Sequence, residues 1–173
     1  YISDMSSGIF SLYVAPVENK FIGKDTVKPK KLVSSARQND FEQLNILTPG
    51  ICWSPDNKSI TISAKSGGED AIFIIDAKTG KYEKIKPGFS SITSVIWSPD
   101  GKKIAFVGIK NLQSDLFYYD LETETVYSIT NDVFTDKSPT WSNDSKTIFF
   151  ISDRGENFKS DNINKVKIWN ENI

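Results

Sequence analysis

The chain has 173 residues, of which 38% are hydrophobic and 25% are charged, which is the makeup of a soluble globular protein. Lys and Arg number 21 and Asp and Glu 22, so the net charge of −1 gives no field that would attract nucleic acid or an anionic membrane. No apolar run approaches the ~18 residues that span a bilayer, and a single cysteine, Cys52, excludes an internal disulfide but leaves the compartment open.

The first residues predict part of a small sheet. The segment "YISD" (1–4) is similar to "FISD" (150–153), which closes an apolar strand near the other end of the chain. Two more strands are predicted, "FSLYVAP" over 10–16 and "KPKKLVS" over 28–34, with a polar loop between them. We therefore expect a partial unit over residues 1–34 that begins within its second strand.

The next segment predicts a complete unit of four short strands over residues 48–86. The expected strands cover 50–53, 59–64, 71–76 and 81–86, and turn-forming residues separate them. Strands such as "IFII" are apolar on both faces. That composition suits sheets that stack face to face with a neighbour on each side.

The third segment repeats this plan over residues 92–130. Its first two strands flank "WSPDGK", a tight hairpin in which Pro99 presets φ and Gly101 accepts a positive φ, as Asn57 should in the hairpin before it. Trp53 and Trp141 begin related motifs, each 44 residues from Trp97. Repeats of roughly 40 to 45 residues that contain four strands are typical of β-propeller blades.

The last segment, residues 138–173, predicts a partial blade. Two strands are clear, "NKVKIWN" (164–170) is the expected third, and no fourth follows. In this hairpin Asn143 replaces the proline and Ser145 the glycine. Ser145 must take an uncommon backbone conformation or change the turn, so we expect this hairpin to be the least regular of the three.

Two complete blades and two partial ones have fewer strands than the ~16 of a four-bladed ring. We therefore interpret the chain as all-β, an incomplete arc of a six- to eight-bladed propeller formed by a single segment over 1–173. The terminal sheets should expose apolar faces, through which we expect self-association. Candidate residues on these faces are Leu12, Val14, Phe149 and Ile151.

The hairpin motifs "WSPDNKSITIS", "WSPDGKKIAFVG" and "WSNDSKTIFFISDRGE", with the strand endings "FIIDAKTG" and "FYYDLETE", resemble the TolB-like, WD-like propeller repeat. This repeat is found in TolB, in tricorn-type proteases and in prolyl-oligopeptidase-like enzymes. It is a structural module that serves unrelated functions. The resemblance implies a periplasmic or secreted location if the chain is TolB-like, and a cytoplasmic one if it is part of a peptidase.

The residue types argue against chemistry within this segment. Histidine is absent, which excludes a Ser-His-Asp triad and His-ligated metal sites. No nucleophile, phosphate-binding or calcium-binding motif occurs, so we expect no catalytic residue, no metal and no cofactor. Cys52 lies in an apolar strand and is interpreted as a small buried side chain.

The repeated residues are given structural roles. One tryptophan per blade at a fixed strand position is expected to pack between blades as core. One aspartate per hairpin is expected to hydrogen-bond its own backbone. The structural repeat residues are Trp53, Asp56, Trp97, Asp100, Gly101, Trp141 and Asp144.

Recognition is expected at one end of the propeller. Because strand direction alternates, the repeated turns share one end, and loops of varied sequence, such as 35–46, share the other. We call the second end the variable-loop end. Its candidate contact residues are Arg37, Glu69, Asp70, Asp115, Asp132, Asp153 and Arg154.

Two classes of function stay open. The first is a non-enzymatic scaffold that binds a protein or peptide partner, as the resemblance to TolB implies. The alternative is the accessory propeller domain of a prolyl-oligopeptidase-like serine hydrolase whose catalytic domain is absent from this chain. A propeller lyase or sugar-processing enzyme is weaker, because its site would need basic and metal-binding side chains. We expect neither nucleic-acid binding nor membrane insertion.

Overall fold

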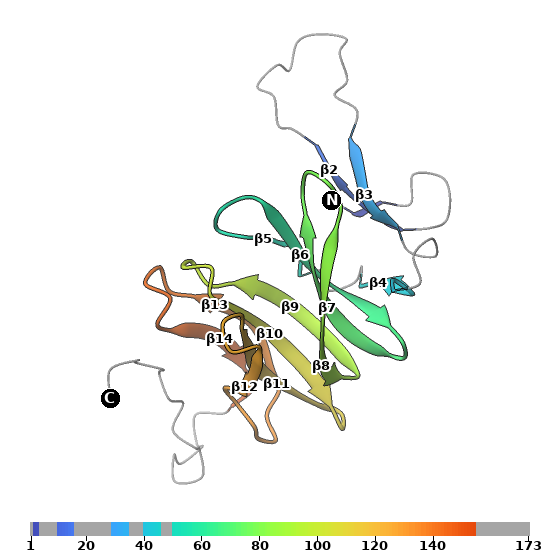
Figure 1. Cartoon of the computed structure of the whole chain (residues 1–173). Coiled ribbons are helices and arrows are strands. Elements are labelled where there is room, and N and C mark those ends of the chain that lie inside the picture. Colours follow the sequence, from blue (N-terminus) through green and yellow to red (C-terminus); the bar gives the residue numbers. More distant parts are fainter. Residues whose placement is uncertain (1, 4–9, 16–28, 35–39, 46–49, 155–173) are drawn as a thin grey trace, which may run out of the picture.

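The computed structural model describes residues 2–3, 10–15, 29–34, 40–45 and 50–154. In these residues the chain forms strands that pair antiparallel within four sheets, which confirms the all-β prediction (Figure 1). The described part of the chain includes no helix that could cross a membrane.

The first two sheets come from the N-terminal half. The three-stranded first sheet has the order β1 (Ile2–Ser3), β2 (Ser11–Val14) and β3 (Lys30–Ser34). The five-stranded second sheet consists of β4 (Gln43–Leu44), β5 (Cys52–Trp53), β6 (Ser59–Ser66), β7 (Glu69–Asp76) and β8 (Tyr82–Phe89). Both β4 and β5 pair with β6, so they are two pieces of one edge strand.

The other two sheets follow in chain order. The four-stranded third sheet consists of β9 (Ser91–Trp97), β10 (Lys103–Lys110), β11 (Gln113–Asp120) and β12 (Thr125–Ser128). The fourth, as far as it is described, consists of β13 (Asp136–Trp141) and β14 (Ile148–Ser152). Each strand of the third sheet pairs with the strand that follows it in sequence, which is the arrangement of a propeller blade.

The residues of β4 lie in a segment that we expected to be a loop, and that expectation was wrong for Gln43–Leu44. Leu44 pairs with Ala64 as Ile92 pairs with Gly108 in the third sheet. Leu44 and Phe41, which lies just before β4, are each 1% exposed. The edge strand therefore begins earlier than its sequence suggests, because an insertion separates its apolar start from the recognisable motif at Trp53.

A bulge recurs in these edge strands. The register between β9 and β10 shifts at Ala105/Val107, and Ser94 opposite has a φ of 55°. The pairing of β13 with β14 shifts in the same way, with Ser138 at a φ of 56°. In the second sheet the equivalent position is Gly50, where a Cβ would overlap the backbone nitrogen of Val95. At Gly50 the second and third sheets approach so closely that only glycine fits, whereas serines, Ser94 and Ser138, occupy the equivalent positions in the next two sheets.

The three repeated hairpins have one geometry. Asn57 has a φ of 58° and Gly101 a φ of 74°, which confirms the expected positive values. Ser145 takes the uncommon conformation with a φ of 62°, yet its N–H still donates to the carbonyl of Ser142 at 3.0 Å. The expectation that this hairpin is the least regular was wrong, because the turn is held by side chains that the three copies share.

Those side chains are a serine and an aspartate. In the third copy the Ser142 hydroxyl donates to Asp144 at 2.5 Å and accepts the N–H of Thr147 at 2.9 Å. The same bonds occur in the other two hairpins. The hydroxyl hydrogen bonds lower the pKa of Asp56 and of Asp144, so both carboxylates are stabilised in their ionised form.

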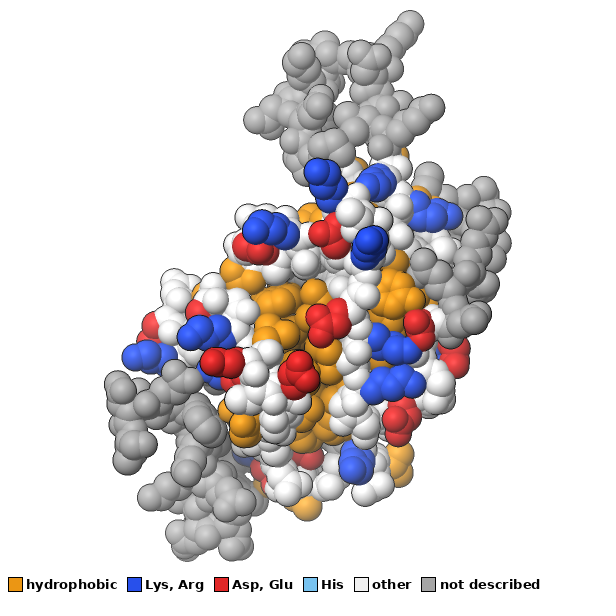
Figure 2. Space-filling view, viewed as in Figure 1, with side chains coloured by type: hydrophobic (Ala, Val, Ile, Leu, Met, Phe, Trp, Pro, Cys, Tyr) orange, Lys and Arg blue, Asp and Glu red, His pale blue; other side chains and the backbone are white. Residues whose placement is uncertain are grey.

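Apolar residues fill the space between successive sheets. Phe73 and Ile62 of the second sheet are at most 2% exposed and belong to the cluster that packs against the first sheet. Phe106 and Ile104 of the third sheet are fully buried in the next cluster. Figure 2 shows hydrophobic side chains along the middle of the face in view, where these two sheets meet, and charged side chains around them. Burying each such side chain contributes about 1.5–3 kcal/mol.

The tryptophans are less uniform than expected. Trp97 is half-buried against the second cluster, and its Nε1 donates to the Thr61 hydroxyl of the preceding sheet at 2.5 Å. Trp141 is also half-buried, but its Nε1 has no hydrogen-bond partner. The position equivalent to Thr61 is Ala105, which offers no acceptor. This substitution explains the unpaired nitrogen.

Trp53 departs further, because it is 44% exposed and does not have the core position that we expected. In the first sheet the strand that corresponds to β6 is β1, which has only two described residues. Among the described residues Trp53 has no contact like the hydrogen bond that Trp97 makes with Thr61 of β6. The repeat motif predicts the position of the tryptophan along the strand, but it does not predict whether another sheet covers it.

The expected exposed faces are present at one end of the arc only. Phe149 is 62% exposed and Ile151 is 56% exposed, as expected. Leu12 is 0% exposed and Val14 is half-buried, and both pack in the cluster between the first and second sheets. The expectation was therefore wrong for these two residues, because β2 turns its apolar side chains toward the second sheet.

We predict that Thr61→Val lowers the free energy of unfolding by about 1–2 kcal/mol, because it leaves the Trp97 N–H without its acceptor while keeping the side-chain shape. Urea unfolding followed by fluorescence measures the change. In a Trp97→Phe background the same substitution should cost much less. An equal cost in both backgrounds would show that the hydrogen bond contributes nothing.

Candidate functional site

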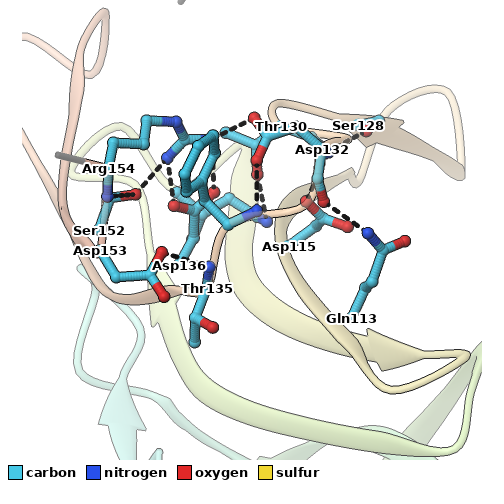
Figure 3. A network of polar contacts seen from close by, with 12 residues as sticks. Gln113, Asp115, Ser128, Thr130, Asp132, Thr135, Asp136, Ser152, Asp153 and Arg154 are labelled. Carbon is cyan, nitrogen blue, oxygen red and sulfur yellow. Dashed lines mark hydrogen bonds and ion pairs between the residues drawn. The ribbon is translucent and has the colours of Figure 1, made fainter. Parts of the chain in front are cut away.

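Four charged residues meet at the variable-loop end of the third and fourth sheets (Figure 3). Asp115 lies near the start of β11, Asp132 lies between β12 and β13, and Asp136 begins β13. Arg154 follows the end of β14. We call these four residues the Asp–Arg cluster. Strands from two adjacent sheets position it, so it lies on the seam between them.

Arg154 links two of the three carboxylates. Its guanidinium donates to Asp136 through both terminal nitrogens, one at 3.2 Å, and to Asp132 through one of them. Asp136 is 0% exposed, whereas the Asp132 side chain is 27% exposed. Asp132 is therefore the member of this bridge that solvent or a partner can reach.

Neighbouring groups hold the guanidinium in place. The Ser152 hydroxyl accepts a hydrogen bond from Arg154. The rings of Phe134 and Phe150 lie 5.5 Å and 5.6 Å from its central carbon, within the range of cation–π attraction. The Arg154 Nε is buried without a hydrogen-bond partner. The Arg154 side chain is thus held in place by hydrogen bonds to the carboxylates and by contacts with the two aromatic rings.

The backbone around the cluster is also ordered by carboxylates. The N–H of Asp132 donates to Asp115 at 3.2 Å, and the N–H of Phe134 donates to the Asp132 carboxylate at 3.0 Å. The Asp153 carboxylate accepts the N–H of Thr135 at 2.8 Å. These bonds fix the loop between β12 and β13 against the end of β14.

The electrostatics of the cluster are unbalanced, with one guanidinium for three carboxylates. Burial raises the pKa of Asp115, and the negative charges of Asp132 and Asp136 raise it further. Burial alone would lower the pKa of Arg154, but the hydrogen bonds and charges of Asp136 and Asp132 outweigh it and raise that pKa. The site therefore stabilises the charged form of Arg154 and disfavours the ionised form of Asp115.

The preceding repeat shows what the fold itself requires at these positions. Forty-four residues earlier, the places of Asp115, Asp132 and Asp136 are taken by Ala71, Gly88 and Ile92. Ala71 and Ile92 are both 0% exposed, so the fold accepts apolar residues there. The carboxylates of Asp115, Asp132 and Asp136 are therefore absent from the preceding repeat, although in this repeat the first two also hold the loop between β12 and β13.

The carboxylate oxygens of Asp115, Asp132 and Asp136 lie within 4.8 Å of one another, close enough to share one ligand. Such oxygens suit a hard cation such as Ca²⁺ or Mg²⁺. Two of the three, however, already accept hydrogen bonds from the Arg154 guanidinium. The Arg154 guanidinium therefore serves as the cation of the cluster, and we assign no metal to it.

Of the seven predicted contact residues, the structure brings four to this place: Asp115, Asp132, Asp153 and Arg154. Glu69 is exposed at the start of β7, away from the cluster. Asp70 is 3% exposed and accepts hydrogen bonds from Asn45 and from the N–H of Ile92, each at 2.8 Å. Asp70 therefore joins two sheets. Arg37 lies outside the described residues.

Sequence reasoning missed Asp136, the most buried carboxylate of the cluster. A signal was available, because it stands in the column of Ile92, an apolar residue that begins the apolar part of the preceding edge strand. Ser152, in the column of Gly108, was missed for the same reason. Comparing columns for polar residues in apolar positions would have found both.

Cys52 lies in β5 and is half-buried, not fully buried as expected. Its neighbour Trp53 is exposed, so the same end of the second sheet is uncovered at both residues.

The chain is similar in sequence to one characterised domain family. Residues 42–159 match the family described as the TolB beta propeller domain. No curated protein sequence matches the chain.

Several solved structures share its fold. TolB from Acinetobacter baumannii is 20% identical, with a TM-score of 0.67 over 87% of this chain and 33% of that one. A TolB-type protein from Agrobacterium tumefaciens is 19% identical, with a TM-score of 0.59 over 87% of this chain and 52% of that one. Tricorn protease is 20% identical, with a TM-score of 0.53 over 73% of this chain and 12% of that one. The chain thus spans about a third to a half of the length of the two TolB structures.

We predict that Arg154→Gln lowers the free energy of unfolding by about 3 kcal/mol, because it leaves the fully buried Asp136 carboxylate without its cation. Denaturant unfolding at neutral pH measures the loss. Adding Asp136→Asn should recover much of it, since the buried charge is then gone. A double variant no more stable than Arg154→Gln would contradict this account.

We predict that Asp115→Asn raises the free energy of unfolding at pH 7. A carboxyl group whose pKa is raised by folding is destabilising while ionised, and this penalty disappears as the pH falls through its folded pKa toward the unfolded value of about 3.9. The gain should therefore shrink over that range of pH. Asp144→Asn is the control with the opposite sign, because folding lowers the pKa of Asp144. A destabilised Asp115→Asn variant at pH 7 would refute the prediction.

Proposed function

This chain belongs to the TolB beta propeller domain family, and we propose that it is a non-enzymatic scaffold that binds a protein or peptide partner at its variable-loop end. The binding element is the Asp–Arg cluster, and the partner group that it recognises is a cationic side chain. The family relationship supports the scaffold part of this proposal. The recognition part depends on the cluster itself.

One observation carries the proposal: three carboxylates replace Ala71, Gly88 and Ile92 of the preceding repeat at one point on the seam between two sheets. Burying the charges of Asp115 and Asp136 costs stability, and apolar residues, Ala71 and Ile92, occupy the equivalent places in the preceding repeat. Buried charges that the preceding repeat does without are typical of functional sites, although carboxylates of this cluster also hold the loop between β12 and β13. The position agrees with this, because recognition on repeat scaffolds generally lies in the varied loops.

The charge balance favours a cation as the recognised group. Arg154 neutralises only part of the negative charge, and the partly exposed Asp132 carboxylate is oriented by the Phe134 N–H. Asp153 is exposed beside it and has one carboxylate oxygen bonded to the Thr135 N–H. A guanidinium or ammonium group of a partner would meet preoriented acceptors at little entropic cost.

The second hypothesis from the sequence, an accessory domain of a serine hydrolase, draws on the same likeness of fold through tricorn protease. A fold shared by binding proteins and peptidases does not discriminate between them. The charged cluster favours binding, because the described residues supply no histidine base and no activated nucleophile beside it.

The test uses the peptide acetyl-Gly-Gly-Arg-Gly-Gly-amide, with a citrulline peptide of the same shape as the neutral control. We expect the arginine peptide to shift the NMR signals of the Gln113, Asp132, Phe134 and Thr135 amides, and the citrulline peptide to shift them far less. Asp132→Asn should weaken binding about fivefold, the effect of losing one partly exposed ion pair.

The matched control is Asp144→Asn, which removes a carboxylate from the hairpin at the other end of β13 and should leave binding unchanged. Equal shifts with both peptides, or equal weakening by both variants, would reject the cluster as the cation site. Hydrolysis of the peptide that survives repurification would reject the non-enzymatic role.

A further inference from the structure

The turn between β10 and β11 presents a leucine to solvent. Leu112 is 98% exposed, and with Asn111 it forms the two-residue connection between Lys110 and Gln113, which pair where the two strands meet. Asn111 has a φ of 52° and Leu112 a φ of 64°, so both residues lie in the left-handed region. A leucine rarely adopts that conformation, because its Cβ crowds the backbone there.

The preceding repeat shows that the turn does not require this leucine. The equivalent turn, 44 residues earlier, consists of Gly67 and Gly68, with φ values of 70° and 84°. Glycine adopts such values without steric cost. Leu112 thus makes the turn less favourable, and the side chain that it adds lies almost entirely in solvent. Residues held in unfavourable backbone conformations are concentrated at binding and catalytic sites.

A second exposed apolar side chain lies on the neighbouring loop, between β12 and β13. Val133 is 80% exposed. Gln113, which follows Leu112, donates from its side-chain nitrogen to the carbonyl of Asp132, which precedes Val133, at 2.8 Å (Figure 3). This hydrogen bond joins the turn to the loop, with one exposed apolar residue next to each of its ends. We call Leu112 and Val133 the apolar pair.

The exposure of the apolar pair does not result from a missing sheet. The third sheet has a described sheet on each side, because β9 contacts β6 and β7, and β13 contacts β10 and β11. Further blades of a propeller would pack on the outer faces of the terminal sheets. Leu112 and Val133 lie instead on connections between strands, at the variable-loop end. The apolar pair therefore belongs to the surface of that end.

We propose that the apolar pair binds an apolar side chain of a partner peptide, next to the cationic side chain that the Asp–Arg cluster binds. The inference rests on the proposed function and adds the kind of residue that flanks the cation. Asp132 joins the two parts of the surface, because its carboxylate bonds Arg154 and its carbonyl accepts the Gln113 bond. Val133 follows Asp132 directly, so one short peptide segment can contact both parts.

The charges beside the apolar pair favour a peptide over a lipid surface. The partly exposed Asp132 and the exposed Asp153 are negative, so they repel an anionic membrane and attract a basic peptide. Membrane binding also strengthens with the apolar area that is buried, and two side chains supply little. For a peptide that a charged group already holds, one apolar contact is enough to change the affinity measurably.

The test compares three peptides by NMR titration. The first is acetyl-Gly-Leu-Arg-Leu-Gly-amide, the second has asparagine in place of both leucines, and the third has citrulline in place of the arginine of the first. Leucine stands on both sides of the arginine, so the direction of binding does not affect the comparison. We expect the leucine peptide to bind about fivefold more tightly than the asparagine peptide. Equal affinities of these two overturn this inference alone, whereas equal affinities of the arginine and citrulline peptides overturn the proposed function.

The variant Leu112→Gly copies the turn of the preceding repeat. It should bind the leucine peptide about fivefold less tightly and the asparagine peptide as the wild type does. Its urea midpoint should be no lower than that of the wild type, because glycine suits the left-handed backbone. Weaker binding by this variant is then a loss of contact and not of folding.

Two control variants should leave the binding of every peptide unchanged. Gly68→Leu adds a leucine to the preceding turn, where it should lower the urea midpoint. Phe149→Ser removes an apolar side chain of β14 that is 62% exposed outside the apolar pair. The proposal is overturned if either control weakens binding as Leu112→Gly does, or if Leu112→Gly binds the leucine peptide as the wild type does. Binding of the chain to phosphatidylcholine vesicles that Leu112→Gly abolishes would overturn it in favour of a lipid surface.

Discussion

The contact on which the described structure depends is the packing of an edge strand on the second strand of the preceding sheet, as β9 packs on β6 and β13 on β10. Strands β6 and β10 are buried on both faces, so their sheets depend on the neighbouring sheets for stability in water. Trp97 on Thr61 and the close approach of Gly50 to Val95 show how tightly the sheets are applied to each other. Stability is then a sum over interfaces between neighbours, as in other repeat architectures, and each sheet is only as well formed as the one beside it.

This constraint also explains where a site can arise. Positions in the middle of the β6 and β10 faces are filled by packing between sheets, whereas the strand ends at the variable-loop end lie outside that packing. Asp136 is an intermediate case, because it begins β13 and is fully buried. It is tolerated only because Arg154 supplies the opposite charge. The Asp–Arg cluster therefore forms only when the third and fourth sheets are packed against each other as they are in this structure.

The sequence was sufficient for whatever repeats. The period of 44 residues, the hairpin motif and the two-faced apolar strands predicted the fold class and the positive φ of Asn57 and Gly101. It was insufficient wherever the outcome depends on a neighbouring sheet. The burial of Leu12 follows from the sheet that packs against it, which periodicity does not encode. The variable-loop end was predicted as the site from topology. The convergence of Asp115 and Arg154 was not predicted, because the bulges and loop paths that bring them together have no simple sequence signal.

Departures from the repeat differ in whether the structure compensates for them. Ala105 in place of a threonine leaves the Trp141 nitrogen unpaired, and among the described residues no group replaces the lost acceptor. Asp136 in place of an isoleucine would be far more costly, yet Arg154, Ser152 and two aromatic rings surround it with partners. The first departure leaves a small cost uncorrected. The second is offset by partners from β14, from the residue after it and from the loop before β13, which together hold the guanidinium against the buried carboxylate of Asp136.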